Sequence, residues 1–366
     1  MVEKKRHILQ LTDQLEIRGS STQILMLVDH LDSSRYHITT VTPGFPALFR
    51  PHWFERDVLE YKYLTHWLIG QYVRRILLRD MQLNRPDLIH IHTRRMLPLG
   101  QWLAQQLKVP YLCSIYDFVP AEMSLQLDRQ WLGHVTAVSS AVKTSLIENS
   151  NLEEKDVEVT YGGVELAEEG YEPGIMQSGV APVVGVASPL EPIKGVDIFL
   201  QAAAKVCQQY PEVEFLIAGT GPEEAALRKF SRELKIETRV TFLSSINDFA
   251  EALRTMDIYC LPSLQQGLGT IMLEAMSFAR PVIACGVGGV HTVVTDRQTG
   301  LLVIPGDVEG LATAIEELLE SPQFARELGE RARVMIQERF RIETLVERTQ
   351  NLYQSTIEKF SQTSSA

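Results

Sequence analysis

The chain has 366 residues, of which 45% are hydrophobic and 22% charged, and its formal net charge at pH 7 is −11. This length exceeds the size of a single hydrophobic core, so two domains of about 150 to 200 residues are expected. The ordinary globular composition excludes a disordered chain, and the net negative charge argues against nonspecific nucleic-acid binding.

Short apolar segments alternate with amphipathic ones through the first part of the chain. The segments 7–12, 37–42, 88–92, 109–116 and 135–138 are expected as strands, and 22–31 and 100–107 as helices. One or two further helices are expected in the aromatic-rich segment that ends at Asp80. This alternation predicts a parallel sheet covered by helices on both faces, with ligands at the carboxyl ends of the strands.

A second series of the same kind follows a stretch of weak periodicity rich in Glu, Gly, Pro and Ser. Expected strands are 183–187, 213–218, 240–243, 258–261, 281–284 and 301–304, and expected helices are 195–209, 223–234, 247–255, 271–278 and the segments from 308 onward. The predicted fold class is α/β, with two doubly wound Rossmann-like domains facing each other across a cleft. The expected boundaries are a domain at 1–165, a linker at 166–181, a domain at 182–340, and a C-terminal helix at 341–366 that returns towards the first domain and ends in a frayed tail.

The cysteines and apolar runs bear on the compartment. The four cysteines are isolated and lie in apolar surroundings: Cys113, Cys207, Cys260 and Cys285. They predict reduced core thiols in a cytosolic protein and neither a disulfide framework nor a zinc site. The N-terminus lacks the features of a signal peptide, and no uncharged apolar run approaches the ~20 residues of a membrane span. We therefore expect a cytoplasmic protein, with a peripheral position at the inner face of the membrane as the alternative.

The most informative segment, 262–276, joins a glycine loop to a helix. Gly267 and Gly269 let the backbone approach a ligand closely, and the helix expected from about Thr270 directs its positive end at the loop. Glu274 falls one turn inside that helix, within reach of a polar ligand. These features predict a site for a nucleoside diphosphate. Because residues after 165 hold 17 Lys and Arg against 27 Asp and Glu, local donors must hold such an anion.

This segment does not stand alone. Lys194-Gly195 lies upstream, and Gly288-Gly289, 299–303 and 305–307 follow downstream. In combination these motifs resemble the donor half of the family-4 (group 1) retaining glycosyltransferases of the GT-B fold. The resemblance implies transfer of a hexosyl unit from a UDP- or GDP-sugar to a saccharide or lipid-linked acceptor, as in polysaccharide biosynthesis, with retention of configuration. It implies no cofactor and no metal, and it makes 182–340 the donor domain and 1–165 the acceptor-side domain.

The resemblance also assigns roles to individual residues. Lys194 would meet the diphosphate, Glu274 the ribose, and Gln266 the donor sugar, where the family has a glutamate. Gln266 keeps hydrogen bonding but loses the charge. Other expected donor contacts come from backbone at glycine loops and at a helix start: Gly19, Gly219, Gly221, Gly267, Leu268, Gly269 and Thr270. Each of these residues also has a plain structural interpretation, a tight turn or a solvated helix start.

The first domain supplies fewer candidates. His92 and Tyr116 are acceptor-side candidates, and Asp117 is a catalytic candidate, because the family has a His-Asp pair where this chain has Tyr116-Asp117. Tyrosine is a poor base near neutral pH. His90 and His92 alternate onto one strand face, and hydrogen-bonded strand histidines are a better interpretation than metal ligands, since no third ligand has suitable spacing.

Several departures from the family pattern support an alternative. Pro189 stands where the family has an arginine, a loss of donors that could lower the rate by ~100-fold. Together with Gln266, Tyr116 and Gly162 it motivates a catalytically weak or inactive donor-binding scaffold that partners an active glycosyltransferase, although altered donor choice explains the same losses. A nucleotide-sugar epimerase is a third interpretation, disfavoured by the contexts of Lys194 and Glu274.

A basic helical stretch at 72–79, preceded by Lys62, His66 and Trp67, bears on membrane contact. A solvated helix face is the simpler interpretation. The alternative is a helix that rests on an anionic membrane beside a lipid-linked acceptor.

Overall fold

The computed structural model describes residues 5–13, 20–44, 58–168, 170–244 and 249–363. The chain divides into two compact units. The first unit holds residues 1–162 and 342–366, and the second holds 163–341. Residues 166–181, expected as a linker, are therefore part of the second unit. No helix in the described ranges is long and apolar enough to cross a bilayer.

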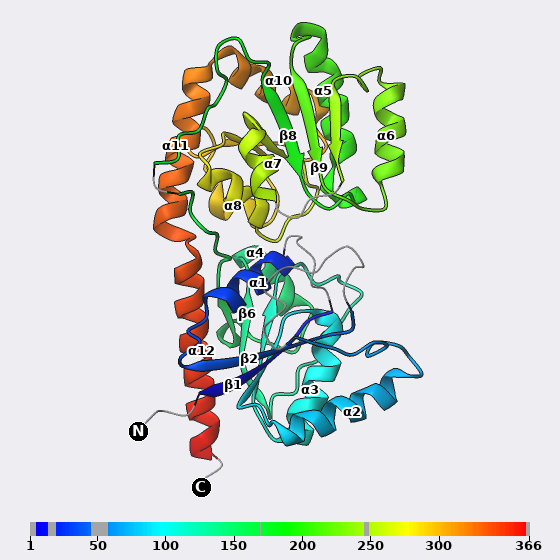
Figure 1. Cartoon of the computed structure of the whole chain (residues 1–366), viewed down its shortest axis with the longest axis vertical. Helices are drawn as coiled ribbons and strands as arrows, with labels where there is room; N and C mark the ends of the chain where they lie inside the picture. The colour runs from blue at the N-terminus through cyan, green and yellow to red at the C-terminus, as the bar shows by residue number, and fades with distance from the viewer. Residues whose placement is uncertain (1–4, 14–19, 45–57, 169, 245–248, 364–366) are drawn as a thin grey trace. The chain divides into compact units, whose positions relative to one another are not determined.

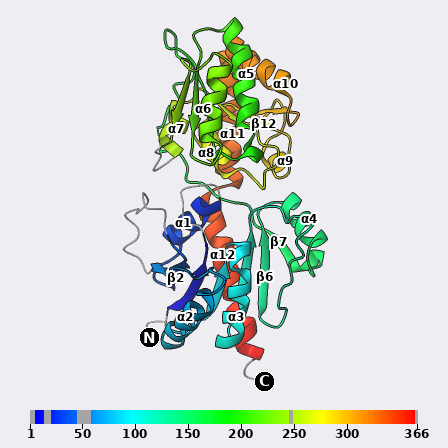
Figure 2. The same ribbon diagram turned by 90° about the vertical axis from the view of Figure 1, so that its right-hand side faces the viewer.

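The first unit is built on a seven-stranded parallel sheet with the order β3-β2-β1-β4-β5-β6-β7. Its strands are β1 Arg6–Leu11, β2 Tyr36–Thr42, β3 Val58–Glu60, β4 Leu88–Ile91, β5 Tyr111–Ile115, β6 Leu132–Ala137 and β7 Val157–Val159. Its helices are α1 Ser20–His30, α2 Gly70–Leu83, α3 Leu97–Leu107, α4 Ser140–Glu148 and α12 Ile342–Thr363. Helices α1 and α12 pack together on one face, and α2 and α3 pack together on the other (Figures 1 and 2).

Helix α12 completes the core of this unit although it is the last element in the chain. Its buried side chains Ile342, Val346, Leu352, Tyr353 and Ile357 pack in one cluster with side chains of β1, α1, β4 and β5. The first strand and the last helix thus share a core, and the first unit needs both ends of the chain.

Three elements of the first unit were not predicted from the sequence. Strands β3 and β7 have three residues each and lie at the two edges of the sheet, so neither shows a run of apolar side chains. Helix α4 is preceded by the N-cap residue Ser139, whose Oγ accepts a hydrogen bond from the backbone N–H of Val142. The apolar periodicity of α4 is too weak to predict a helix from the sequence.

The second unit has a six-stranded parallel sheet with the order β10-β9-β8-β11-β12-β13. Its strands are β8 Val183–Ala187, β9 Glu214–Ala218, β10 Val240–Leu243, β11 Ile258–Leu261, β12 Val282–Cys285 and β13 Leu301–Val303. Its helices are α5 Val196–Gln209, α6 Glu224–Glu233, α7 Phe249–Thr255, α8 Thr270–Ser277, α9 Val290–Val293, α10 Val308–Glu320 and α11 Pro322–Arg339. Helix α5 packs against α6 and α10, and α8 packs against α7 and α11.

The segment before β8 is tied to the second unit by hydrogen bonds. The carboxylate of buried Asp257 accepts from the backbone N–H groups of Met176 at 2.5 Å and Val183 at 2.8 Å. Arg333 donates to the carbonyl oxygen of Tyr171 at 3.2 Å. These bonds tie Tyr171, Met176 and Val183, in and next to the segment whose composition predicted a linker, to the second unit.

Both sheets reverse their strand order once. In the second unit the reversal lies between β8 and β11, and in the first between β1 and β4. In doubly wound folds ligands bind outside the carboxyl ends of the strands at this point. The loops that follow these four strands are therefore where a site is expected.

Candidate functional site

In the second unit, the loops after β8 and β11 meet at the reversal of strand order. The backbone N–H of Leu264 donates to the carbonyl oxygen of Ile193 at 2.9 Å. Gly195 has φ of +65°, and a Cβ there would lie 2.2 Å from the carbonyl oxygen of Pro262. Glycine is therefore needed at Gly195 both for its backbone conformation and for this close approach.

This contact brings the predicted cation to the glycine loop. The half-buried Lys194 donates from Nζ to Oε1 of Gln266 at 3.3 Å. The loop then runs through Gly269, with φ of +99°, into α8, whose first residue is Thr270. Unpaired N–H groups at a helix start carry partial positive charge. Lys194 therefore adds its charge to a loop that leads into a helix end of the same sign, an arrangement that favours an anion.

Glu274 projects from the same helix. Seven of the eight residues of α8 are buried, and Glu274 is the exception. Burial, then Cys260, and then the negative charge of Glu274 raise the pKa of Tyr259, whose hydroxyl donates to the carbonyl oxygen of Ala187 at the end of β8. Glu274 thus lies on the helix that directly follows the glycine loop.

Two neighbouring glycine turns support these loops. A Cβ on Gly219 would lie 1.9 Å from the carbonyl oxygen of Ser188, and one on Gly221 would lie 2.3 Å from that of Leu190. The N–H of Leu190 also donates to the carbonyl oxygen of Thr220 at 2.9 Å. The β9–α6 turn thus holds the loop after β8.

The glycine loop itself is held from the other side. Gly289 donates its N–H to the carbonyl oxygen of Gln266 at 3.0 Å, and a Cβ on Gly289 would lie 1.9 Å from the carbonyl oxygen of Gly267. Gly267 and Leu268 are buried. The loop's shape is therefore set by backbone packing as well as by its own sequence.

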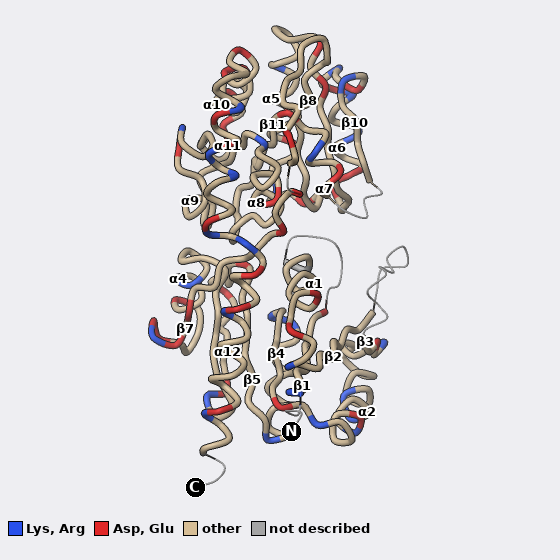
Figure 3. Tube along the Cα trace, turned by 60° about the vertical axis from the view of Figure 1, so that its left-hand side comes forward, with Lys and Arg blue, Asp and Glu red and all other residues tan. Residues whose placement is uncertain are grey.

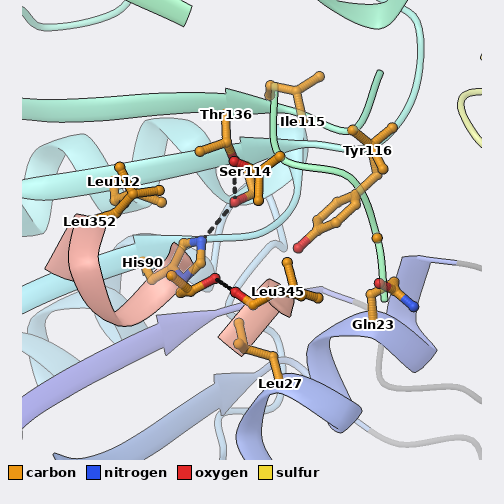
Figure 4. A pocket seen from close by; sticks show the side chains of 14 residues that line it. Gln23, Leu27, His90, Leu112, Ser114, Ile115, Tyr116, Thr136, Leu345 and Leu352 are labelled. Atoms are coloured by element: carbon orange, nitrogen blue, oxygen red, sulfur yellow. Dashed lines mark hydrogen bonds between the residues drawn. The ribbon is translucent and has the colours of Figure 1, made fainter. Parts of the chain in front are cut away.

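The first unit has a small pocket among the ends of β4, β5 and β6 and helices α1 and α12 (Figure 4). It encloses about 20 Å³, roughly the room of one water molecule. Both ring nitrogens of His90 form hydrogen bonds. Nδ1 lies 2.7 Å from the hydroxyl of Tyr353, and Nε2 lies 2.8 Å from the hydroxyl of Ser114. Ser114 in turn bonds Thr136 at 2.8 Å.

The two acceptor-side candidates touch each other beside this pocket. His92 Nδ1 lies 3.1 Å from the hydroxyl of Tyr116, which lines the pocket. Burial lowers the pKa of His92 to about 3, and burial together with His92 holds the pKa of His90 well below its usual value. Burial also raises the pKa of Tyr116. All three side chains are therefore uncharged near neutral pH, so this region supplies hydrogen bonds and no charge.

The predicted residues fall into three groups. Lys194, Gln266 and the 267–270 loop lie together with Glu274 on the helix that follows. His92 and Tyr116 lie together in the first unit, where Asp117 is exposed directly after Tyr116. Gly19 lies outside the described residues.

Two buried serines were not predicted from the sequence. Ser188 lies one residue beyond the end of β8 and Ser263 two residues beyond the end of β11, and they are 4% and 0% exposed. Within the described residues neither hydroxyl has a hydrogen-bond partner. A serine two or fewer residues beyond a strand at the reversal of strand order is the signal that could have identified them.

Comparisons with known proteins agree with this division. The family model described as Glycosyltransferase Family 4 matches residues 17–168, and that described as Glycosyl transferases group 1 matches residues 181–321. Each model thus matches most of one unit, and together they span most of the chain.

Two curated relatives and one solved structure illustrate the likeness. N-acetyl-alpha-D-glucosaminyl L-malate synthase of Bacillus anthracis is 35% identical over 161 residues, which are 44% of this chain and 42% of the relative. A GDP-mannose-dependent monoacylated alpha-(1-6)-phosphatidylinositol monomannoside mannosyltransferase of Corynebacterium glutamicum is 32% identical over 183 residues, 48% of this chain and 47% of the relative. Both matches span less than half of the relative's own length.

The structural likeness extends over both units. Anabaena HepE in complex with UDP-glucose superposes with a TM-score of 0.82 at 21% identity, covering 95% of this chain and 99% of that one. At this level of identity the superposition shows the fold. With one family domain matched in each unit, the chain belongs to the family-4 and group 1 glycosyltransferases, and its fold is GT-B.

Proposed function

We propose that this protein transfers a hexosyl unit from a nucleoside-diphosphate sugar to a saccharide or lipid-linked acceptor, with retention of configuration and without a metal ion. The donor would bind the second unit at the reversal of strand order between β8 and β11. UDP-sugars are the first donors to test, because the similar Anabaena HepE was solved with UDP-glucose, and GDP-sugars the second, because the Corynebacterium relative is named for GDP-mannose.

One observation carries the proposal: Lys194 Nζ donates to Gln266 Oε1 at 3.3 Å. This hydrogen bond joins the lysine of the loop after β8 to the glycine loop that leads from β11 into helix α8. In this arrangement Lys194 neutralises the diphosphate leaving group, and backbone N–H groups at the start of α8 bind its oxygens. Glu274 accepts from the ribose hydroxyls.

The test uses the full chain with a panel of UDP-, GDP- and ADP-sugars, measuring nucleotide affinity and slow donor hydrolysis. Lys194→Ala should lower hydrolysis by about 100-fold, the usual effect of removing one electrostatic stabiliser. Lys229→Ala is the matched control, because this exposed lysine forms a helical ion pair with Glu233 far along α6. Wild-type protein that binds no nucleotide at all would reject the proposal.

A catalytically weak donor-binding scaffold is the second candidate, and Pro189 favours it. Its loop is fixed by the hydrogen bonds of Ser188 and Leu190 to Ala218 and Thr220, so the loop is well placed but offers no guanidinium to a leaving group. For the scaffold we expect nucleotide binding without turnover in any acceptor mixture.

Pro189→Arg separates the two candidates. If the deficit is leaving-group stabilisation alone, this substitution should raise hydrolysis by about 100-fold or less at unchanged nucleotide affinity. If the wild type turns over and Pro189→Arg does not increase the rate, this chain works without the arginine. A double variant, Pro189→Arg with Lys194→Ala, shows whether any gain depends on the existing cation.

A further inference from the structure

The first unit exposes an apolar and cationic face on α2 and on the turn before it. Large apolar side chains there are unusually accessible, with Trp67 79%, Tyr72 69% and Leu83 82% exposed. Tyr63, Leu68, Ile69 and Ile76 are exposed as well. Single exposed apolar residues are ordinary on protein surfaces, but a contiguous group of this size marks an interaction site.

The face follows the helical repeat. Tyr72, Ile76, Arg79 and Leu83 are spaced by four, three and four residues, so they form one stripe along α2. Arg75 is exposed beside this stripe. The buried residues of α2, Gly70, Leu77 and Met81, lie on the opposite side of the helix, towards the sheet.

The turn before α2 is held in a fixed shape. His66 Nδ1 accepts from the backbone N–H groups of Leu68 and Ile69, both at 3.3 Å, and Gly70 donates its N–H to the carbonyl oxygen of His66 at 2.8 Å. A Cβ on Gly70 would lie 2.9 Å from the carbonyl oxygen of Leu64. Trp67 is therefore presented from an ordered turn directly beside the stripe.

The charge of this region is opposite to that of the whole protein. Residues 61–85 hold five lysines and arginines and one aspartate, in a chain whose net charge is −11. That aspartate, Asp80, accepts from the hydroxyl of Tyr61 at 2.6 Å, so it faces the preceding segment. Figure 3 shows stretches of blue, for lysine and arginine, along the tube of α2.

We infer that this face binds the surface of an anionic lipid bilayer, with Trp67 and the stripe inserted at the headgroup level and Arg75 and Arg79 among the lipid phosphates. Aromatic side chains and basic residues on one amphipathic face are the combination that interfacial helices use. A protein partner of ordinary acidic surface would satisfy the arginines but leave Trp67, Leu68 and Leu83 against polar groups.

The test is cosedimentation of the full chain with vesicles of phosphatidylcholine alone or with about one third phosphatidylglycerol. We expect binding to the anionic vesicles that weakens at high salt. Because one basic residue near an anionic surface changes binding by about fivefold, Arg75→Glu with Arg79→Glu should lower the partition coefficient by at least about 25-fold. Arg232→Glu with Arg348→Glu is the matched control, since it changes the net charge equally at exposed positions elsewhere.

A spectroscopic arm reports on the orientation. Vesicle binding should shift the tryptophan emission to the blue, and Trp67→Phe should abolish the shift while binding persists. Circular dichroism establishes that each variant is folded. The inference fails if the wild type does not sediment with anionic vesicles, if the control variant loses as much binding, or if Trp67→Phe keeps the shift. It also fails if light scattering shows a dimer that Trp67→Ala dissociates, because a second copy of the chain would then cover the face.

Discussion

Gly289 shows how one residue can set the shape of a ligand loop from outside it. Its backbone is ordinary, with φ of −72° and ψ of −9°, so another residue could adopt its conformation. What excludes a side chain is the carbonyl oxygen of Gly267, 1.9 Å from the place of a Cβ. The constraint is therefore close packing of two backbones and not backbone strain.

We predict that Gly289→Ala displaces the 266–269 loop. Overpacking against backbone should cost about 3 kcal/mol of unfolding free energy, and donor affinity should fall because Gln266 moves with the loop. Chemical denaturation and nucleotide titration measure the two effects. Gly306→Ala is the matched control: its φ is +80° with no atom within 4 Å of a Cβ, so it should cost only about 1 kcal/mol of strain and spare affinity. Equal affinity in both variants would contradict the role given to Gly289.

The burial of His92 predicts a pH dependence of the unfolding free energy. Its pKa is about 3 in the folded chain because of burial, against about 6.5 when unfolded. Between these values the unfolded state binds more protons, so stability is complete above pH 6.5 and falls as the pH drops towards 3. By pH 4.5 this one group should cost about 2.5 kcal/mol. His92→Gln should therefore flatten the dependence of unfolding free energy on pH, measured by urea denaturation, whereas His291→Gln, at an exposed position, should not. Parallel curves for the wild type and His92→Gln would show that His92 is not held neutral.

At the scale of elements, much of the fold follows from patterns within single segments. The alternation of apolar strands and amphipathic helices predicted two parallel-sheet α/β domains, and this is confirmed. What local patterns miss are features stabilised from elsewhere. Strands β3 and β7 are short edge strands, and Tyr171 and Met176 are held by hydrogen bonds to Arg333 and Asp257 far along the chain.

In the candidate site, too, some residues follow from a local sequence pattern and other contacts depend on the fold. The glycine loop and α8 are a local pattern, so Gly267, Gly269 and Glu274 could be selected from the sequence. The bond between Lys194 and Gln266 joins residues 72 positions apart, and that between His90 and Tyr353 joins residues 263 positions apart. Neither hydrogen bond can be predicted from the separation of its residues along the sequence, because each contact depends on how the strands are ordered in the sheet.

Asp257 gives the prediction at this scale. Asp257→Ala leaves two backbone N–H groups, of Met176 and Val183, without their carboxylate. Hydrogen bonds to a charged group contribute about 1.5 to 3 kcal/mol each, so we expect a loss of about 3 kcal/mol or more. Asp257→Asn keeps one acceptor and should lose about half of that. Denaturation gives both values, and limited proteolysis should show new cleavage within 166–181. A protected segment in Asp257→Ala would mean that other contacts suffice.

At the scale of the whole molecule, the two units differ in how the chain builds them. The second is one continuous segment, whereas the first takes its last helix from the C-terminus. All four tryptophans, Trp53, Trp67, Trp102 and Trp131, precede residue 163. Tryptophan fluorescence therefore reports on the first unit alone, and nucleotide binding reports on the second.

Removal of residues 342–366 should unfold the first unit and leave the second unit folded. The fragment loses five buried apolar side chains of α12, each contributing about 1.5 to 3 kcal/mol, a total near the whole stability of a domain. The hydroxyl partner of His90 is lost as well.

For the fragment 1–341 we therefore expect tryptophan emission typical of an unfolded chain and no cooperative transition by that signal. Nucleotide affinity should stay within about twofold of the full chain if donor contacts come from the second unit alone, since twofold is only ~0.4 kcal/mol. A matched full-length variant, Tyr353→Phe, keeps the apolar packing and removes only the hydroxyl, so its tryptophan transition should persist at lower stability. Native emission from the fragment would show that α12 is dispensable. Loss of nucleotide binding, with the second unit still folded by circular dichroism, would show instead that the first unit contributes to the donor site.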